Sequence, residues 1–359
     1  MALRVLIAGG GTGGHVIPAL AIARELRDAH AAEVRFVGTA RGLETRLVPE
    51  AGFSLQLIHV GQLKNVSVLT RLRTLADLPL GVARCISLLR SFKPQVVVGV
   101  GGYASGPAMM AAILLSIPTL AFEPNAVPGL ANRLIGRLVR GAAVNFAQTR
   151  SYFNNAVVTG IPVRREFFSI GPKSHGGLRL LVFGGSQGAR VLNAVMPEVA
   201  RALLAEFEVL TIVHQAGGRQ IETTLAGYAA AAVGSERLRV VPYLDGMVEE
   251  IAAADVVLCR SGASTVAELA AAGRASVLVP FAAAADDHQR KNAEVLVQTG
   301  AARMILEEEL TPESALRAVR SLLLSQPERE AMGERARGLA FADAAGRIAE
   351  MCVDFAESK

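Results

Sequence analysis

Short hydrophobic runs that end in glycines recur along the chain. Residues 3–8 (LRVLIA) form an apolar run of strand length, glycines follow it, and the next residues place apolar positions with helical spacing. The pattern returns at Leu178, where "LRLLVFGGSQGARVLNAVMPEVARALL" echoes "LRVLIAGGGTGGHVIPALAIARELR", with Gly184 in the position of Gly9. Each copy predicts a buried strand, a glycine turn and an amphipathic helix.

Further units of the same kind follow each copy. "PQVVVGVGGYASGPAMMAAILL" and "ADVVLCRSGASTVAELAAAG" each read as strand, glycine turn and helix, and "ASVLVPF" reads as another buried strand. Strands that alternate with helices predict parallel, doubly wound sheets, and the repeat predicts two of them. Residues 157–168 contain turn-forming Gly and Pro and read as a linker. We therefore expect domains at 1–160 and 161–340, and a final helix in 341–359 that packs on the first domain.

Length and composition agree with two domains. A chain of 359 residues, half of them hydrophobic, can bury two ordinary cores. Cys85, Cys259 and Cys352 are scattered, which predicts reduced thiols rather than a disulfide framework. The first residues lack the layout of a signal peptide. The longest apolar stretch is bounded and broken by Pro107 and Pro118 and is too short to span a bilayer, so we expect a soluble or peripheral protein.

The net charge of +5 conceals an asymmetry between the halves. Residues 1–163 carry 16 Lys and Arg against 7 Asp and Glu, whereas residues 164–359 carry 21 against 25. A basic first half indicates an anionic partner for that half. We expect no nucleic acid as partner, because no basic stretch interleaved with aromatic residues and no binding fingerprint occurs.

The first glycine loop fits the pattern G-x-G-x-x-G over Gly9 to Gly14. A dinucleotide would also need an acid at the end of the second strand, "EVRFVGT", whose only acid, Glu33, is at its beginning. The loop therefore reads as a turn that tolerates a phosphate, or as a tight turn that binds nothing. His15 ends this loop at the carboxyl edge of a strand, where open α/β sheets place their sites.

The segment "RSGASTVAELAAAG", from Arg260 to Gly273, predicts a nucleotide diphosphate site. Its helix begins near Ser264 and Thr265, whose hydroxyl and N–H groups suit a diphosphate. Glu268 lies one turn further, where a carboxylate can accept both hydroxyls of a ribose. The alternative is a capping arrangement in which Glu268 only stabilises the first turn.

The segment "AAAADDHQRKNAE" contains Asp286, Asp287 and His288, but no partner cluster for a metal site, so we expect no metal. Gln289 and Asn292 suit hydrogen bonds to a sugar, or alternatively begin a solvated helix.

Two features belong to the first half. "FEPNAVPG" places Glu123 and Asn125 after a strand, at the same predicted sheet edge as His15. Residues 63–93 mix apolar side chains with basic ones, which suits an anionic membrane surface or, alternatively, a solvated helix face. The basic residues concerned are Lys64, Arg71, Arg73, Arg84, Arg90 and Lys93, with Arg133, Arg137 and Arg140 on a later helix.

Together, "GGGTGGH", "GVGGYASGP", "FGGSQGAR" and "CRSGASTVAEL" closely resemble the MurG family of membrane-associated N-acetylglucosaminyltransferases. The motifs occur in family order over essentially the whole chain. The resemblance implies a GT-B fold of two Rossmann-like domains facing across a cleft. It implies the conversion of lipid I to lipid II in peptidoglycan synthesis, by a peripheral protein at the cytoplasmic face of the cell membrane. UDP-GlcNAc would be the donor and an undecaprenyl-linked lipid the acceptor, with no cofactor.

The resemblance also implies roles for single residues. Leu244 would meet the uracil through its backbone, Gln289 the sugar, and Tyr103 and Ser105 would line the acceptor side. The remaining residues matched to donor positions are Thr12, Gly13, Gly14, Asn125, Arg164, Ser186, Ala263, Ser264, Thr265, Val266, Ala267 and Glu268. The family pattern differs after Gln62, where "LKNVS" replaces a glycine-rich loop, and at "FEPN".

An α-linked donor and a β-linked product imply one in-line displacement with inversion. His15 is the first candidate for the base that activates the acceptor hydroxyl, because an imidazole titrates near neutral pH, and Glu123 is the second. Arg164 and the helix start near Ser264 would stabilise the leaving diphosphate. The alternative activity on the same fold is a UDP-GlcNAc 2-epimerase.

Overall fold

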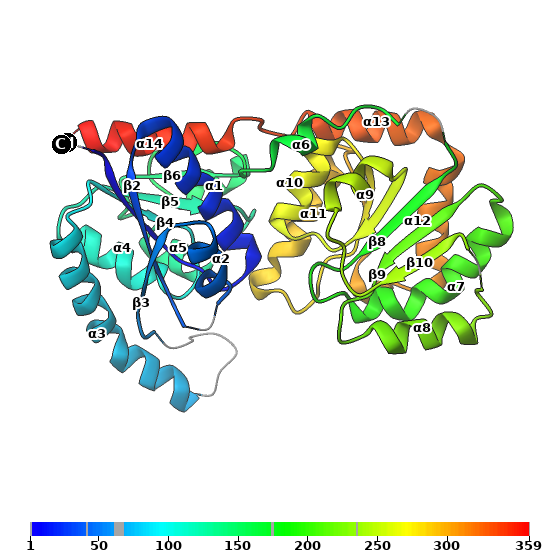
Figure 1. Ribbon diagram of the computed structural model, residues 1–359, viewed down its shortest axis with the longest axis horizontal. Helices are drawn as coiled ribbons and strands as arrows, with labels where there is room; N and C mark the ends of the chain where they lie inside the picture. The colour runs from blue at the N-terminus through cyan, green and yellow to red at the C-terminus, as the bar shows by residue number, and fades with distance from the viewer. Residues whose placement is uncertain (1, 41, 61–67, 174–175, 235, 359) are drawn as a thin grey trace. The chain divides into compact units, whose positions relative to one another are not determined.

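The computed structural model divides the chain into two compact units (Figure 1). Unit 1 comprises Met1–Pro162 and Asp343–Lys359, and unit 2 comprises Val163–Ala342. The structure describes residues 2–40, 42–60, 68–173, 176–234 and 236–358, with the backbone alone for 68–77.

Unit 1 is built on a seven-stranded sheet in which every pairing is parallel, in the order β3-β2-β1-β4-β5-β6-β7. The strands are β1 (Arg4–Ala8), β2 (Glu33–Gly38), β3 (Ser54–Leu57), β4 (Val96–Gly99), β5 (Thr119–Glu123), β6 (Gly141–Val144) and β7 (Ala156–Val158). The helices are α1 (Gly13–His30), α2 (Glu44–Glu50), α3 (Val68–Phe92), α4 (Ser105–Leu114), α5 (Leu130–Ile135), α14 (Ala344–Glu357) and the 3-10 helix η1 (Ala147–Tyr152).

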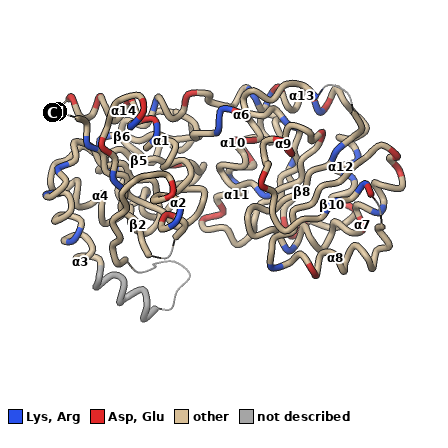
Figure 2. The backbone as a smooth tube through the Cα atoms, viewed as in Figure 1, with Lys and Arg blue, Asp and Glu red and all other residues tan. Residues whose placement is uncertain are grey.

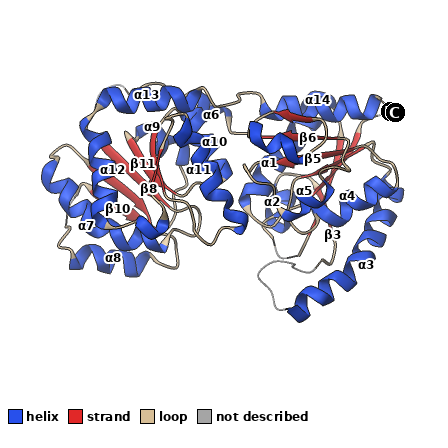
Figure 3. Cartoon of the chain, turned by 180° about the vertical axis from the view of Figure 1, so that it is seen from behind, coloured by secondary structure: helices blue, strands red, loops and turns tan. Residues whose placement is uncertain are grey.

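The final helix α14 returns to unit 1 after the chain has traversed unit 2. It packs beside α1, as Figure 1 and Figure 3 both show. The guanidinium of Arg140 lies 5.2 Å from the ring centroid of Phe355 and donates a hydrogen bond to the carbonyl of Ser358 at 3.0 Å. A methyl group at Gly141 would lie 2.7 Å from that ring, so glycine lets the helix approach β6.

Unit 2 has a six-stranded parallel sheet in the order β10-β9-β8-β11-β12-β13. The strands are β8 (Arg179–Phe183), β9 (Thr211–Gln215), β10 (Leu238–Val241), β11 (Val256–Cys259), β12 (Ala275–Leu278) and β13 (Arg303–Met304). The helices are α6 (Arg165–Phe168), α7 (Arg190–Glu206), α8 (Ile221–Ala230), α9 (Met247–Ala253), α10 (Ala263–Ala272), α11 (His288–Gln298), α12 (Pro312–Leu324) and α13 (Gln326–Arg337), with 3-10 helices η2 (Ala285–Asp287) and η3 (Glu307–Glu309).

The hydrophobic runs of the sequence form the inner strands of both sheets. β4 reads VVVG, β11 reads VVLC and β12 reads ASVL, and all twelve residues are buried. A strand covered by helices on both faces needs continuous apolar residues instead of alternation, which explains these runs. Strand β1 stands between β2 and β4 as β8 stands between β9 and β11, so the sequence repeat is a structural repeat. Both units are Rossmann-like, as predicted.

The three cysteines are free thiols in buried positions, and burial raises the pKa of Cys85 to about 11. Among the described residues, no three His, Cys, Asp or Glu side chains gather as they would around a metal ion. Searched over the same residues, no helix combines the length and apolar character that crossing a bilayer requires.

Candidate active site

The first glycine loop joins β1 to α1 and brings its backbone against two other segments. Gly9, Gly10 and Gly11 have φ values of 144°, 153° and 95°, a region that favours glycine. Their amide groups donate to Val37 O at 3.0 Å, Gly101 O at 3.3 Å and Glu44 Oε2 at 2.7 Å, respectively. These three donors are therefore used within unit 1. The amides of Gly13 and Gly14 belong to the first turn of α1, whose leading N–H groups have no partner within the helix.

The sequence pattern did not reveal the acid beside this loop. Glu44 begins α2 and is 1% exposed. Its carboxylate accepts hydrogen bonds from the amide and hydroxyl of Thr39 at 3.0 and 3.1 Å, besides that from Gly11. No acid stands at the end of β2, and the acid beside this loop comes from the following helix α2 instead.

A second glycine loop follows β4 and supports His15. Gly101 and Gly102 have φ values of 88° and 82°. A methyl group at Gly102 would lie 2.4 Å from the carbonyl oxygen of Gly10, and one at Gly101 would lie 2.9 Å from Cε1 of His15. The imidazole therefore lies directly over the second loop, half-buried, at the carboxyl edge of the sheet.

The two residues expected on the acceptor side differ in exposure. Tyr103 is 41% exposed and is available to a ligand. Ser105 is fully buried, and its Oγ would lie 2.8 Å from a methyl group placed at Gly99. Ser105 therefore packs α4 against β4 instead of presenting its hydroxyl at the surface.

Glu123, the second candidate for the base, is 2% exposed at the end of β5. Oε1 accepts hydrogen bonds from the backbone and side-chain amides of Asn125, each at 3.0 Å. Oε2 accepts from the amide of Gly129 and the side chain of Asn132, each at 3.0 Å. Burial raises the pKa of Glu123, and these four hydrogen bonds oppose that rise. The arrangement orients Asn125 and its loop and uses both oxygens of the Glu123 carboxylate.

In unit 2, α10 begins directly after β11 and presents the residues of the motif. Its N-cap Gly262 has no side chain to cap the helix, and no side-chain cap is formed. The Oγ of Ser264 is buried without a hydrogen-bond partner among the described residues. A helix start with an unused hydroxyl is a suitable anion site. Thr265 and Ala267 are half-buried, whereas Ala263 and Val266 are buried and fix the helix on the sheet.

Glu268 lies one turn into α10 and has a strongly perturbed carboxyl group. Its surroundings remove most of its hydration, which raises its pKa to about 7, while the nearby charge of Arg164 opposes the rise. Arg164 is exposed, and its guanidinium lies 4.9 Å from the ring centroid of Phe167. An arginine beside a carboxyl group whose pKa is near 7, at the edge of a sheet, is typical of a functional site.

Three other loops meet the carboxyl edge of this sheet. Ser186 is exposed in the glycine loop after β8, where Gln215 donates to the carbonyl of Gly185 at 2.9 Å. Leu244 is 5% exposed, so its side chain is not available to a ligand. Gln289 accepts a hydrogen bond from the amide of Phe281 at 3.0 Å through its side-chain oxygen.

A partly buried ion pair supports the loop after β12, and the sequence pattern did not reveal it. Arg260 donates to Glu307 at 2.8 Å and to the carbonyls of Val279 and Pro280 at 3.1 and 3.0 Å. Glu307 also accepts from the amide of Ala282 at 3.0 Å. The pair thereby fixes the segment that leads to Gln289.

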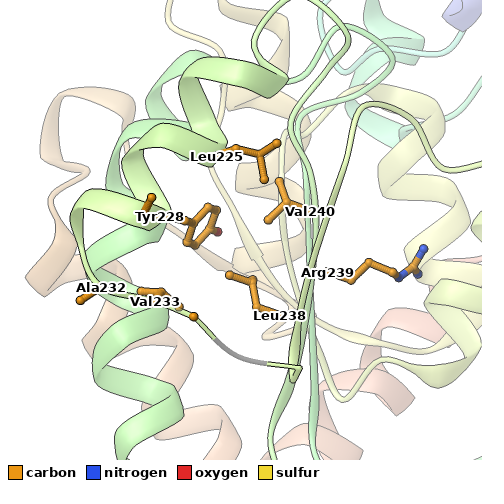
Figure 4. A pocket seen from close by; sticks show the side chains of 9 residues that line it. Leu225, Tyr228, Ala232, Val233, Leu238, Arg239 and Val240 are labelled. Carbon is orange, nitrogen blue, oxygen red and sulfur yellow. The ribbon is translucent and has the colours of Figure 1, made fainter.

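A surface pocket of about 670 Å³ lies elsewhere in unit 2, between α8 and β10 (Figure 4). Leu225, Tyr228 and Val240 line it, together with residues of the turn that leads into β10. It contains none of the predicted site residues, and it adjoins the amino end of β10, whereas ligands of parallel sheets bind at carboxyl ends. Tyr228 forms its buried wall and hydrogen-bonds Nδ1 of His214 at 2.8 Å.

Comparison with known proteins agrees with this geometry. Residues 5–144 match the N-terminal domain of glycosyltransferase family 28, and residues 179–348 match its C-terminal domain. A protein of Syntrophotalea carbinolica is 42% identical, with 98% of this chain and 98% of that protein covered. The chain belongs to glycosyltransferase family 28. This relative is named UDP-N-acetylglucosamine–N-acetylmuramyl-(pentapeptide) pyrophosphoryl-undecaprenol N-acetylglucosamine transferase.

Other members of the family place the chain more closely. A Myxococcus xanthus protein of the same name is 45% identical, with 98% of this chain and 93% of that protein covered. The crystal structure of Acinetobacter baumannii MurG is 32% identical and superposes with a TM-score of 0.82, with 98% of this chain and 99% of that chain covered. The predicted resemblance to the MurG family and the predicted fold class are confirmed, and the chain is a glycosyltransferase.

Proposed function

We propose that this glycosyltransferase moves N-acetylglucosamine from UDP-GlcNAc to the 4-hydroxyl of the MurNAc residue of an undecaprenyl-pyrophosphoryl acceptor, converting lipid I to lipid II. The observation that supports it best is the start of α10, where an unused buried hydroxyl, a helix N-terminus and a carboxylate lie within one turn. A helix N-terminus with an unused hydroxyl suits a diphosphate, and a carboxylate one turn further can accept the hydroxyls of a ribose. Relatives with 42–45% identity are named for this transfer.

The donor residues of unit 2 divide by chemistry. The N-terminus of α10, with Ser264 and Thr265, takes the diphosphate, and Arg164 adds positive charge. Glu268 accepts the ribose hydroxyls, and the backbone at Leu244 meets the uracil. Gln289 and Ser186 hydrogen-bond the remaining polar groups of the donor. These groups also stabilise the charge that develops on UDP as it leaves.

The residues of unit 1 act on the acceptor and on the transferred sugar. His15 takes the proton of the attacking 4-hydroxyl, a form of catalysis that contributes about 10²–10⁴-fold. Thr12, Gly13, Gly14 and Asn125 reach the sugar of the donor, with Asn125 oriented by the buried carboxylate of Glu123. Tyr103 contacts the acceptor.

The same unit provides a surface for an anionic membrane. The residues of α3 whose side chains are described, 78–92, include Arg84 and Arg90 and no acidic residue, and Asp77 lies just before them (Figure 2). Arg84 and Arg137 are exposed, and near them in sequence Leu80, Leu134 and Leu138 are 54%, 67% and 55% exposed. Apolar side chains beside arginines favour the interface of a bilayer with anionic lipids. The side chains of Arg71 and Arg73, expected to share this role, lie outside the described residues.

A radiolabel transfer assay tests the proposed function. Purified protein, labelled UDP-GlcNAc and a short-chain lipid I analogue should yield labelled disaccharide lipid, whereas UDP-GalNAc should transfer poorly. Incubation without acceptor should leave UDP-GlcNAc unchanged. Conversion of UDP-GlcNAc to its 2-epimer without acceptor, with no labelled lipid formed, would instead support the epimerase alternative.

A further inference from the structure

The first glycine loop contains an acidic side chain in the position where related loops bind a ligand. Backbone N–H groups of a loop between a strand and a helix form a concave site for anions such as phosphate. Here the Gly11 amide donates to Oε2 of Glu44 at 2.7 Å, and the Gly11 carbonyl accepts from the amide of Leu43 at 3.1 Å. Leu43 and Glu44 therefore bind both backbone polar groups of one loop residue, Gly11.

The surroundings of Glu44 are shaped to hold a carboxylate. Methyl groups at Gly10 and Gly42 would lie 2.3 Å from its Cδ and 1.8 Å from its Oε2, respectively, and one at Gly38 would lie 2.6 Å from its Cγ. Three glycines from three segments thus leave room for one acidic side chain. A carboxylate that is 1% exposed is stable there because the hydrogen bonds from Gly11 and Thr39 replace its lost hydration.

We propose that Glu44 is a positioning residue whose carboxylate takes the place of a bound anion in the first glycine loop and fixes the loop under His15. The connection runs through backbone. Gly10 donates to Gly101, which supports the imidazole ring, and Thr12 O accepts from the amide of His15 at 3.1 Å. Loss of the carboxylate frees the Gly11 amide and the loop that sets the position of the imidazole. The positioning of His15 by Glu44 rests on the proposed function of His15. The filling of the anion position by the Glu44 carboxylate does not depend on that function.

Glu44→Ala and Glu44→Gln test the proposal, with Glu50→Ala on the exposed side of the same helix as the matched control. Truncation to alanine opens space for a small carboxylate, so sodium formate should raise the Tm of Glu44→Ala saturably above a sodium chloride control of equal ionic strength. The wild-type protein and Glu50→Ala should show no such difference, because both keep the Glu44 carboxylate in the first glycine loop.

Turnover provides the second readout. Glu44→Ala should lose at least tenfold in kcat, and formate should restore part of it, while the affinity for UDP measured by calorimetry stays within twofold of wild type. Glu44→Gln keeps the side-chain volume but turns an amide group toward N–H donors, so it should also lose at least tenfold. If Glu44→Ala folds only when formate is present, that result also supports the proposal. The kcat of Glu44→Gln then tests whether the carboxylate affects catalysis.

Two results would overturn the proposal: no effect of formate on the Tm, folding or kcat of Glu44→Ala, or wild-type kcat in Glu44→Gln. A wild-type protein without transfer activity would refute the proposed function alone. In that case the formate-dependent Tm of Glu44→Ala still decides whether the carboxylate occupies an anion position.

Discussion

Glu268→Gln should make the unliganded protein more stable and the nucleotide site worse. The folded protein raises the pKa of this carboxyl from 4.5 to about 7. The folded state therefore binds the proton more tightly than the unfolded chain, and stability falls as the pH rises from 4.5 to 7. Glutamine has no proton to lose, so the variant escapes this fall.

The expected size follows from the shift. Each pKa unit corresponds to about 1.4 kcal/mol, and the partial exposure of the side chain reduces the total. The free energy of unfolding of Glu268→Gln relative to wild type should therefore grow by about 2 kcal/mol between pH 5 and pH 8. Urea unfolding at several pH values measures it. Glu198→Gln, an exposed carboxyl on α7, is the control and should show no pH-dependent difference.

Ligand affinity gives the complementary measurement. At pH 6 only about a tenth of a carboxyl with pKa about 7 is ionised, so wild-type affinity for UDP-GlcNAc should fall about tenfold from pH 8 to pH 6. UDP-GlcNAc is the correct probe because its diphosphate, unlike that of UDP, does not titrate in this range. Glu268→Gln should bind weakly at both pH values, without this dependence. A stability difference independent of pH would refute the pKa argument, and wild-type affinity in the variant would refute the ribose contact.

Three other outcomes are expected. His15→Ala should lower turnover at least a hundredfold while UDP-GlcNAc still binds in calorimetry, and near-normal turnover would move the base elsewhere. The double variant Arg84→Glu, Arg137→Glu should sediment less with anionic vesicles at low salt than the wild type, and vesicles of neutral lipid should show no difference. If binding to anionic vesicles is unchanged, the two arginines do not contact the membrane. Glu307→Gln should lower the free energy of unfolding by about 2 kcal/mol in urea, because Arg260 loses its charged partner. The exposed control Glu308→Gln should have no effect, and equal stability of Glu307→Gln and wild type would contradict the role of the pair.

The fold was predictable because its signals are local. Hydrophobic runs followed by glycines identified β1, β4, β8 and β11, and the repeat at Leu178 revealed the second sheet. Parallel strands joined by helices have few allowed arrangements, so the doubly wound topology followed. Strand β13 has two residues, Arg303–Met304, which is too short to produce a pattern.

The candidate site was predictable only in part. Glu268 and Ser264 could be found because helix spacing alone sets their distance from the glycine turn. Glu44 and the partner of Arg260 depend on contacts between segments far apart in the chain, which periodicity does not encode. A motif position also does not determine whether a side chain is exposed. Ser105 was expected on the acceptor side, but its hydroxyl is completely buried against Gly99.

The return of α14 to unit 1 makes unit 2 an insertion within the other unit's chain. Two peptide connections cross between the units, after Pro162 and after Ala342. A protease that cleaves only the first connection yields two fragments, and the downstream fragment ends in the helix that packs on α1 of the upstream one. Such nicked protein should co-purify as one species under native conditions and separate only when denatured. A cut at the second connection detaches α14 alone, so the two nicks differ in which piece can dissociate.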